Sequence, residues 1–335
     1  MDDNERKLYP ISFLPDDIVT HWGSVSYKIA DLGSVDSMIG GGWFAGNTLS
    51  ELMGTYLERV VGDEAFEYYG LQFPIMIKEI KTSTWQPLQV NIPDAEAEER
   101  YDSLGKTALW YILDTGEDPK AYLGLSKDLT AGEFYQRCQD GSIKEVLNEI
   151  TPVKGESILI EPGTVFAAGP GLTILEVSES SELAFNIHNW GVDLPDGEEL
   201  LLEEAFDLIN MGKHRRAHAA DATLADRDEF VVKKLDLKDP LHIFSEQPGC
   251  FAVYHCLSGE AAIQPSPGAE GFDQVIFKVG QTVLLPSEVH DILLLPLTEG
   301  TSLLEVSVKE RRDADSYTGA PSEDQAPDPH IRNWN

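Results

Sequence analysis

The sequence predicts a mainly β fold of two antiparallel barrels or jelly rolls, with a helical insert and a few short helices. Two observations support this prediction. Short apolar segments of strand length follow one another through residues 71–195 and again through residues 226–310, and turns rich in glycine and proline separate them. The chain of 335 residues is 42% apolar, which suffices for packed cores in two domains or in one elaborate domain.

Residues 1–70 show little alternation, and we expect this N-terminal segment to pack on the first barrel. Thr48 and Glu51 have the spacing of a capping box, in which each side chain accepts a hydrogen bond from the backbone N–H of the other residue. The apolar pattern that follows them continues to Val61. The sequence therefore predicts an amphipathic helix over residues 48–61.

The first barrel is predicted over residues 71–195 and contains a helical insert at residues 126–150. Within the insert, Thr130 and Glu133 repeat the capping-box spacing and begin an amphipathic segment that we expect to continue to Ile150. The strands expected in this barrel cover residues 73–80, 86–92, 107–114, 120–124, 156–160, 172–177 and 183–190.

A helical linker is predicted at residues 196–225, because apolar residues recur at helical spacing between 198 and 211. The second barrel follows at residues 226–310. The last residues, 311–335, are polar and contain proline, and we expect them to form a tail on the surface. The strands expected in the second barrel cover residues 229–235, 249–257, 261–264, 274–278, 282–285, 290–296 and 302–307.

Charge and hydropathy disfavour several classes of partner. A net charge of −33 leaves no basic excess that could displace counterions from nucleic acid or bind an anionic membrane. No segment approaches the roughly 18 apolar residues of a membrane span, and no apolar run follows the acidic N-terminus. We therefore expect no nucleic-acid partner, no membrane partner and no signal peptide.

The three cysteines favour a reducing compartment. Cys250 and Cys256 fall in one expected strand, where six residues span roughly 20 Å, which is too far for a disulfide. An odd number of cysteines without a disulfide framework is typical of a cytoplasmic protein, which is the location that we expect.

Five short motifs, each weak alone, are specific in combination. They are Phe73–Lys78, Leu88–Val90, Gly105–Thr107, Trp110–Leu113 and Gly163–Val165. In this order and spacing they resemble class I mannose-6-phosphate isomerases, or phosphomannose isomerases, of the short bacterial type. The resemblance covers roughly residues 20–310. It implies two cupin barrels and, for the family, an aldose–ketose isomerisation that moves a proton between C1 and C2 of a hexose phosphate.

The resemblance also implies a metal site, and this chain departs from it. The family binds a divalent metal, usually zinc, through Gln, His, Glu and His. The corresponding residues here are Gln89, Asn91, Ala108 and Phe166, so only the glutamine matches. Zinc requires about four nitrogen, sulfur or oxygen ligands, and alanine and phenylalanine supply none. We therefore expect a divergent member that lacks most of its metal ligands and has no metal cofactor.

The family's phosphate-binding charge is missing as well. The resemblance places Asn186 where the family has an arginine near the site. Residues 155–212 contain twelve Asp and Glu residues and no Lys or Arg. Because a phosphate dianion needs positive charge and hydrogen-bond donors, the sequence favours a neutral sugar or a sugar-like small molecule as ligand.

Polar residues on the strands of the first barrel are the candidates for a binding or catalytic site. Each of them could equally satisfy a buried hydrogen bond or ion pair without binding a ligand. The candidate ligand-binding residues are Gln89, Asn91, Lys106 and Asn186, and the candidate catalytic residues are Lys106, Glu176 and His188.

The second barrel offers three histidines, His242, His255 and His290, as the basis of a relocated metal site. No His-x-His pair and no suitably spaced glutamate accompany them, so the pattern for such a site is weak.

Three functions remain open on the sequence. The first is a metal-free protein of carbohydrate metabolism without isomerase activity, which binds a sugar-like ligand or a protein partner. The second is an active sugar or sugar-phosphate isomerase or epimerase with a rebuilt, metal-independent site. The third is a regulatory or structural partner of an active isomerase from the same cell. A protein partner or a homodimer is accordingly expected as a possible assembly.

Overall fold

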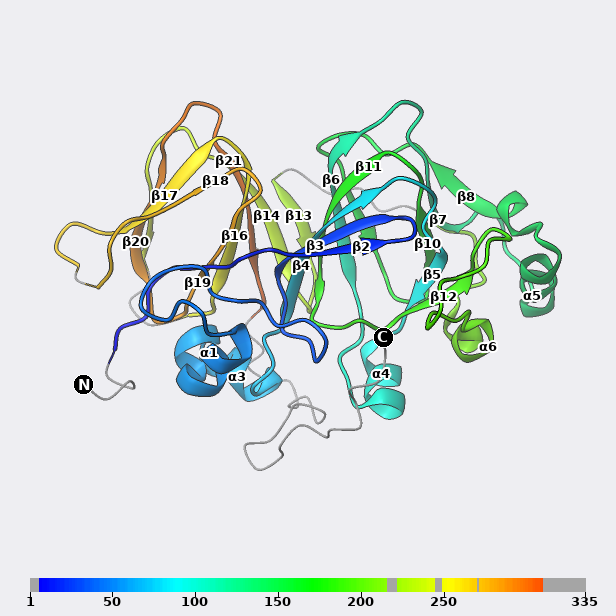
Figure 1. The fold of residues 1–335 in the computed structure, drawn as a ribbon, viewed down its shortest axis with the longest axis horizontal. Coiled ribbons are helices and arrows are strands. Elements are labelled where there is room, and N and C mark those ends of the chain that lie inside the picture. The colour runs from blue at the N-terminus through cyan, green and yellow to red at the C-terminus, as the bar shows by residue number, and fades with distance from the viewer. Residues whose placement is uncertain (1–5, 216–221, 245–248, 270, 310–335) are drawn as a thin grey trace. The chain divides into compact units, whose positions relative to one another are not determined.

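A computed structural model describes residues 6–215, 222–244, 249–269 and 271–309, and these residues form two compact units (Figure 1). The terminal unit takes the described residues of ranges 1–16, 28–75 and 219–329, and the central unit takes those of ranges 17–27 and 76–218. Both units consist mainly of antiparallel strands, as the sequence predicts.

The central unit contains two antiparallel sheets. The first has six strands in the order β2 (Asp16–Thr20), β3 (Gly23–Ile29), β4 (Ile75–Thr82), β11 (Leu172–Glu179), β6 (Ala108–Thr115) and β9 (Ser157–Ile160). The second has five strands in the order β12 (Ala184–His188), β5 (Leu88–Asn91), β10 (Val165–Ala168), β7 (Ala121–Leu125) and β8 (Leu147–Ile150).

The five-stranded sheet buries both of its faces. Leu88, Val90 and Ile92 pack with residues of helices α4 (Asp94–Tyr101), α5 (Ala131–Asp140) and α6 (Leu202–Ala205) in one apolar cluster. Side chains alternate between the faces of a strand, so Gln89 and Asn91 lie on the opposite face. On that face Leu123 and Phe166 pack with residues of the six-stranded sheet in a second apolar cluster, which is the interior of the barrel.

The terminal unit contains the second pair of sheets. One has the order β1 (Ile11–Ser12), β19 (Thr282–Leu285), β16 (Ala252–Ser258), β21 (Ser302–Ser307), β14 (Val231–Asp236) and β13 (Thr223–Asp226). The other has the order β15 (Leu241–Phe244), β20 (Asp291–Pro296), β17 (Glu260–Pro265) and β18 (Val275–Lys278). Residues of both sheets share one buried apolar cluster.

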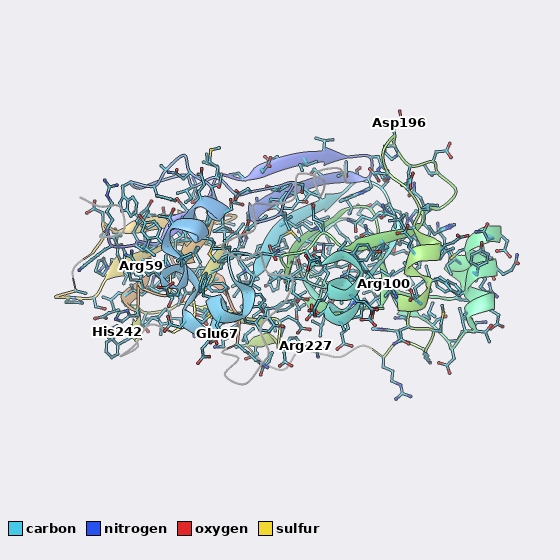
Figure 2. All side chains as sticks on the ribbon, turned by 90° about the horizontal axis from the view of Figure 1, so that it is seen from below. Arg59, Glu67, Arg100, Asp196, Arg227 and His242 are labelled. Carbon is cyan, nitrogen blue, oxygen red and sulfur yellow. The ribbon has the colours of Figure 1, made fainter. Side chains whose placement is uncertain are left out.

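Helices α1 (Leu49–Tyr56), α2 (Glu58–Val61) and α3 (Asp63–Tyr69) belong to the terminal unit. The backbone N–H of Ser287 donates to the carbonyl of Val60, and the Phe73 and Phe251 rings lie 4.8 Å apart. Arg59, labelled in Figure 2, forms an ion pair with Glu288. These contacts group residues 28–75 with the second barrel, whereas the sequence favoured packing on the first.

The local predictions hold best where side chains cap the helices. Both capping boxes, at Thr48 and at Thr130, form as predicted. The first helix is nevertheless interrupted at Leu57, which has a positive φ of 49°. The insert helix ends at Gly141 in the left-handed conformation, so the segment before Ile150 is strand β8 and not helix.

The membrane and disulfide predictions concern single features of the described chain. Within the described ranges, no helix has both the length and the apolar character needed to cross a bilayer. Cys138, Cys250 and Cys256 form no disulfide bond with one another. The expected tail at 311–335 lies outside the described residues.

Candidate functional site

Apolar side chains occupy two of the positions at which the resemblance implies metal ligands. Phe166 on β10 pairs with Gln89 on β5, and its ring meets Trp110 on β6 edge to face, with centroids 5.5 Å apart. Ala108 lies two residues before Trp110 on the same strand, and all three belong to the buried interior cluster. The Phe166 ring therefore helps to fill the barrel interior.

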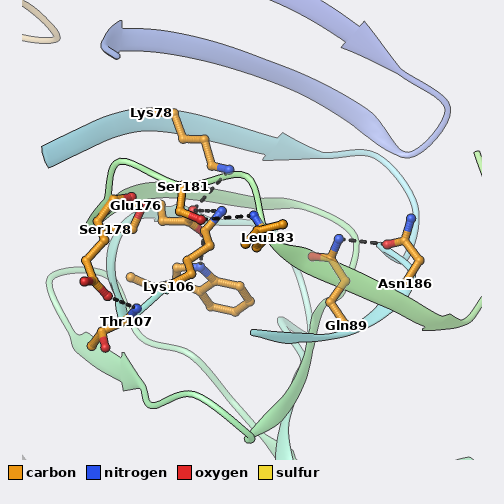
Figure 3. A network of polar contacts seen from close by, with 11 residues as sticks. Lys78, Gln89, Lys106, Thr107, Glu176, Ser178, Ser181, Leu183 and Asn186 are labelled. Carbon is orange, nitrogen blue, oxygen red and sulfur yellow. Dashed lines mark hydrogen bonds and ion pairs between the residues drawn. The ribbon is translucent and has the colours of Figure 1, made fainter. Parts of the chain in front are cut away.

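Beside this aromatic pair, two lysines converge on one carboxylate (Figure 3). Glu176 on β11 accepts a hydrogen bond of 2.9 Å from the indole N–H of Trp110 through Oε2. Its other oxygen, Oε1, lies 3.1 Å from Nζ of Lys78 on β4 and 3.7 Å from Nζ of Lys106. The side chains of Lys106 and Glu176 are only 4% and 5% exposed, so this is a buried charge cluster.

The cluster holds Glu176 ionised. Burial opposes the carboxylate charge, but Lys78, Lys106 and the Trp110 N–H together outweigh burial and lower the pKa of Glu176 to about 2. Burial likewise opposes the charge on Lys78, but the adjacent Glu176 carboxylate prevails and raises the pKa of Lys78 above its ordinary value. Lys78 is therefore the main counter-ion of Glu176.

Lys106 behaves differently from Lys78. Burial is the largest influence on it, and the like charge of Lys78 acts in the same direction, so the pKa of Lys106 falls to about 8 despite the attraction of Glu176. An amine with this pKa is partly deprotonated near neutral pH. Lys106 is thus the residue of the cluster best suited to accept a proton.

A row of amides lies on the same face of the five-stranded sheet as Phe166. Gln89 on β5 pairs with Asn186 on β12, and Nε2 of Gln89 donates to Oδ1 of Asn186 over 2.8 Å. Two residues further along β5, Asn91 pairs with Ala184, whose side chain offers only a methyl group. Asn91 is fully buried, and neither its Oδ1 nor its Nδ2 has a hydrogen-bond partner.

His188 lies apart from Lys106 and Glu176. A β-bulge separates it from Asn186 and brings it opposite Leu88, whose side chain packs toward the helices. Its ring meets Trp190 edge to face at 5.4 Å and lines a hollow of about 880 Å³ together with Lys144. Burial first and Lys144 second lower the pKa of His188. Of the three candidate catalytic residues, Lys106 and Glu176 thus lie together in the charge cluster, and His188 lies separately beside the hollow.

Lys78 and Trp110 belong to this cluster, although the sequence analysis did not select them as site residues. Lys78 shares a strand face with Ile80, which lies in the barrel interior. A lysine at an inward strand position between apolar residues predicts a buried ion pair, because a buried cation requires a counter-ion. The identity of that counter-ion depends on the pairing of distant strands.

The residues present do not fit zinc. Gln89 and Asn91 offer amide groups, Ala108 and Phe166 offer no donor atom, and the Phe166 ring packs where a ligand would have to reach. Among the described residues, no group of three or more His, Cys, Asp or Glu side chains is placed to hold a metal ion.

The histidines of the second barrel are also dispersed. His255 on β16 is buried and bonds Thr282 over 2.8 Å, whereas His242 on β15 lies at the surface against Asp291 (Figure 2). His290 contacts the carbonyl of Glu288. His242 and His290 both lie near enough to Asp291 to lower its pKa, whereas His255 bonds Thr282 in the other sheet, so the three histidines do not share one site.

Comparison with known proteins finds relatives of one kind. No family model matches the chain. A mannose-6-phosphate isomerase of Streptococcus mutans is 24% identical over 263 residues, which are 76% of this chain and 79% of that protein. A mannose-6-phosphate isomerase of Bacillus subtilis is 25% identical over 262 residues, which are 75% of this chain and 79% of that protein.

Solved structures show the same fold. The mannose 6-phosphate isomerase of Bacillus subtilis superposes with a TM-score of 0.75 at 19% identity, covering 89% of this chain and 99% of that one. A putative mannosephosphate isomerase of Archaeoglobus fulgidus gives 0.73 at 18% identity, covering 91% and 99%. A zinc-bound mannose 6-phosphate isomerase gives 0.68 at 13% identity, covering 90% and 100%. The chain is therefore homologous to mannose-6-phosphate isomerases and has the fold of the cupin-type phosphomannose isomerases.

Proposed function

We propose that this protein is a sugar-binding homologue of mannose-6-phosphate isomerases that has no zinc-dependent isomerase activity. The observation that carries the proposal is the buried Phe166 ring against Trp110, next to Ala108, at positions where the family has zinc ligands. A phenylalanine packed into the interior cannot coordinate a metal, and neither remaining amide can hold zinc against water.

The charge around the site favours a neutral ligand. Glu176 compensates the charge of Lys78, the pKa of Lys106 of about 8 leaves that amine partly uncharged, and Glu182 adds a second negative charge that acts on both lysines. Residues 155–212 add acids and no permanent cation. Two like charges 4 Å apart repel by about 4 kcal/mol at an effective dielectric of 20, which exceeds the roughly 1 kcal/mol of one hydrogen bond. A phosphate ester is accordingly disfavoured against its neutral parent sugar.

Two measurements on the purified protein test the proposal. Elemental analysis after dialysis should find no stoichiometric zinc, and added zinc should not produce turnover of mannose 6-phosphate. Thermal-shift titrations should show stabilisation by mannose or fructose in preference to their 6-phosphates. About one zinc per chain that is lost in Gln89→Ala, or stabilisation by a phosphosugar alone that is lost in Lys106→Ala, would contradict the proposal.

A second candidate function follows from the lowered pKa of Lys106. An unprotonated buried amine is a suitable general base, so a metal-independent aldose–ketose isomerase or epimerase is the alternative. Incorporation of solvent deuterium at C2 of an aldose, measured by NMR, would identify it. The incorporation should disappear in Lys106→Met and persist in His188→Gln, because His188 lies apart from the cluster.

A further inference from the structure

The buried amide of Asn91 is an exception to the packing of the barrel. Its residue exposure is 0%, yet neither amide atom has a hydrogen-bond partner. Buried polar groups in proteins are nearly always paired, because an unpaired donor or acceptor loses its bonds to water and gains nothing in return. An unpaired donor and an unpaired acceptor on one side chain therefore call for a partner that the described residues do not supply.

Its surroundings show that folding does not require an amide at this position. The cross-strand neighbour is Ala184, and the face on which Asn91 lies also carries Leu123 and Phe166 of the apolar interior. A leucine of similar volume would suit this environment and would leave no polar atom unpaired. The amide thus acts against stability.

The polar neighbours on the same face continue toward the solvent. Gln89 and Asn186 are half-buried, and their mutual hydrogen bond uses Nε2 of one and Oδ1 of the other. This bond fixes both side chains and leaves Oε1 of Gln89 and Nδ2 of Asn186 able to bind a further group. All three amides are uncharged.

We propose that Asn91 recognises two adjacent hydroxyl groups of the sugar-like ligand, with Oδ1 accepting from one hydroxyl and Nδ2 donating to the next. This inference rests on the proposed function and names its specificity-determining residue. A planar amide presents one acceptor and one donor side by side, and a vicinal diol supplies the complementary pair. Phosphate oxygens, which only accept, would leave the amide oxygen unpaired.

The test compares Asn91→Leu with a matched control, Asn189→Leu. Asn189 is also buried, but its Nδ2 donates to the carbonyl of Val192 over 2.9 Å. Asn91→Leu should raise the melting temperature by about 2 °C or more, whereas Asn189→Leu should lower it. With D-mannose or D-fructose as the probe, Asn91→Leu should bind at least about tenfold more weakly, the loss that follows from removing paired hydrogen bonds.

Mono-deoxy derivatives of the sugar that binds identify the diol. In the wild type, removal of either hydroxyl of one adjacent pair should weaken binding, and in Asn91→Leu the same removals should have little further effect. A stabilised Asn91→Leu that still binds sugar as the wild type does would overturn the inference and leave the proposed function intact. A destabilised Asn91→Leu would also overturn it, because the amide must then be bonded within the fold. Absence of sugar binding by the wild type would overturn both.

Discussion

The pKa of Lys106 is determined by its neighbours and by its burial. Nζ of Lys78 is nearer to Oε1 of Glu176 than Nζ of Lys106 is, so Lys78 is the main partner of the carboxylate. Burial therefore lowers the pKa of Lys106 with little compensation from Glu176. The same residue type thus has a raised pKa on β4 and a lowered one a few ångströms away.

The titration of Lys106 is directly measurable. By NMR of ¹³Cε-labelled lysine, the signal that disappears in Lys106→Met should titrate with a pKa of about 8. In Lys78→Met this pKa should rise, because a like charge is removed and Glu176 becomes the counter-ion of Lys106 alone. An unchanged or lower value in Lys78→Met would show that burial alone sets the titration.

Restoring the ligands tests the placement of the family positions. The variant Asn91→His, Ala108→Glu, Phe166→His should bind about one zinc per chain with Gln89 as the fourth ligand, measured by elemental analysis. Isomerase activity should stay low, because Asn186 cannot supply the charge of the family arginine. The double variant that keeps Phe166 is the control and should not bind stoichiometric zinc. A folded triple variant that rejects zinc would show that these positions do not converge.

At the scale of elements, the strands bring together residues that the chain separates widely. Lys78, Trp110 and Glu176 come from β4, β6 and β11, and the pairing of Glu176 with Trp110 across β11 and β6 places both on one face. Breaking a buried ion pair by removing one partner typically costs about 3–5 kcal/mol, because the other charge is left uncompensated.

The stability of wild type and Glu176→Gln should therefore converge in acid. The folded-state pKa of Glu176 is about 2, below its ordinary value of 4.5, so the unfolded state binds more protons between these values. The stabilisation from Glu176 is fully present above pH 4.5 and is lost as the pH falls toward 2. Denaturant unfolding should show Glu176→Gln less stable by a few kcal/mol at pH 6, with the gap shrinking below pH 4.5. A gap independent of pH would rule out this linkage.

Sequence patterns predicted the elements that depend on local chemistry. Two capping boxes and the apolar alternation of β5, β6 and β11 gave helix starts and strands close to those observed. Strand β8 was missed because its four residues fall inside the insert that the second capping box led us to expect as helix up to Ile150. The predicted helix at 198–211 is shorter, with α6 limited to four residues and followed by a 3₁₀ turn at Phe206–Leu208.

The candidate site was predictable in part for the same reason. Positions such as Gln89 and Asn91 follow from the family resemblance, which is carried by short sequence motifs, and from their place on a predicted strand. The convergence of Lys78 and Lys106 on Glu176 depends on strand order, and the separation of His188 depends on a one-residue bulge. Neither strand order nor a bulge leaves a local pattern in the sequence.

At the scale of the whole molecule, the net charge is the main electrostatic influence on stability. At a net charge of −33, the acidic residues repel one another in the compact folded state, because the 25 Lys and Arg residues can neutralise fewer than half of the 58 Asp and Glu residues. Surface ion pairs such as Arg100–Asp207 contribute little and are weakened by salt. The repulsion, which salt also weakens, is the larger effect.

Ionic strength should therefore stabilise the protein. The melting temperature should rise by several degrees between about 20 mM and 500 mM sodium chloride, because the screening length falls from tens of ångströms to a few. Choline chloride should give the same rise if screening is the cause, whereas binding of a specific cation would make the two salts differ. A melting temperature that falls with salt would mean that ion pairs outweigh repulsion.

The Phe166–Trp110 packing also constrains how this lineage could evolve. Replacing Phe166 by histidine alone removes a buried aromatic contact before any other ligand exists, and replacing Ala108 by glutamate alone buries a carboxylate without a metal. Each single step toward a zinc site therefore costs stability before the complete set of ligands can bind a metal. Because the Phe166–Trp110 contact must be lost before a metal site can form, we expect descendants of this protein to change their existing polar residues and not to gain a metal site.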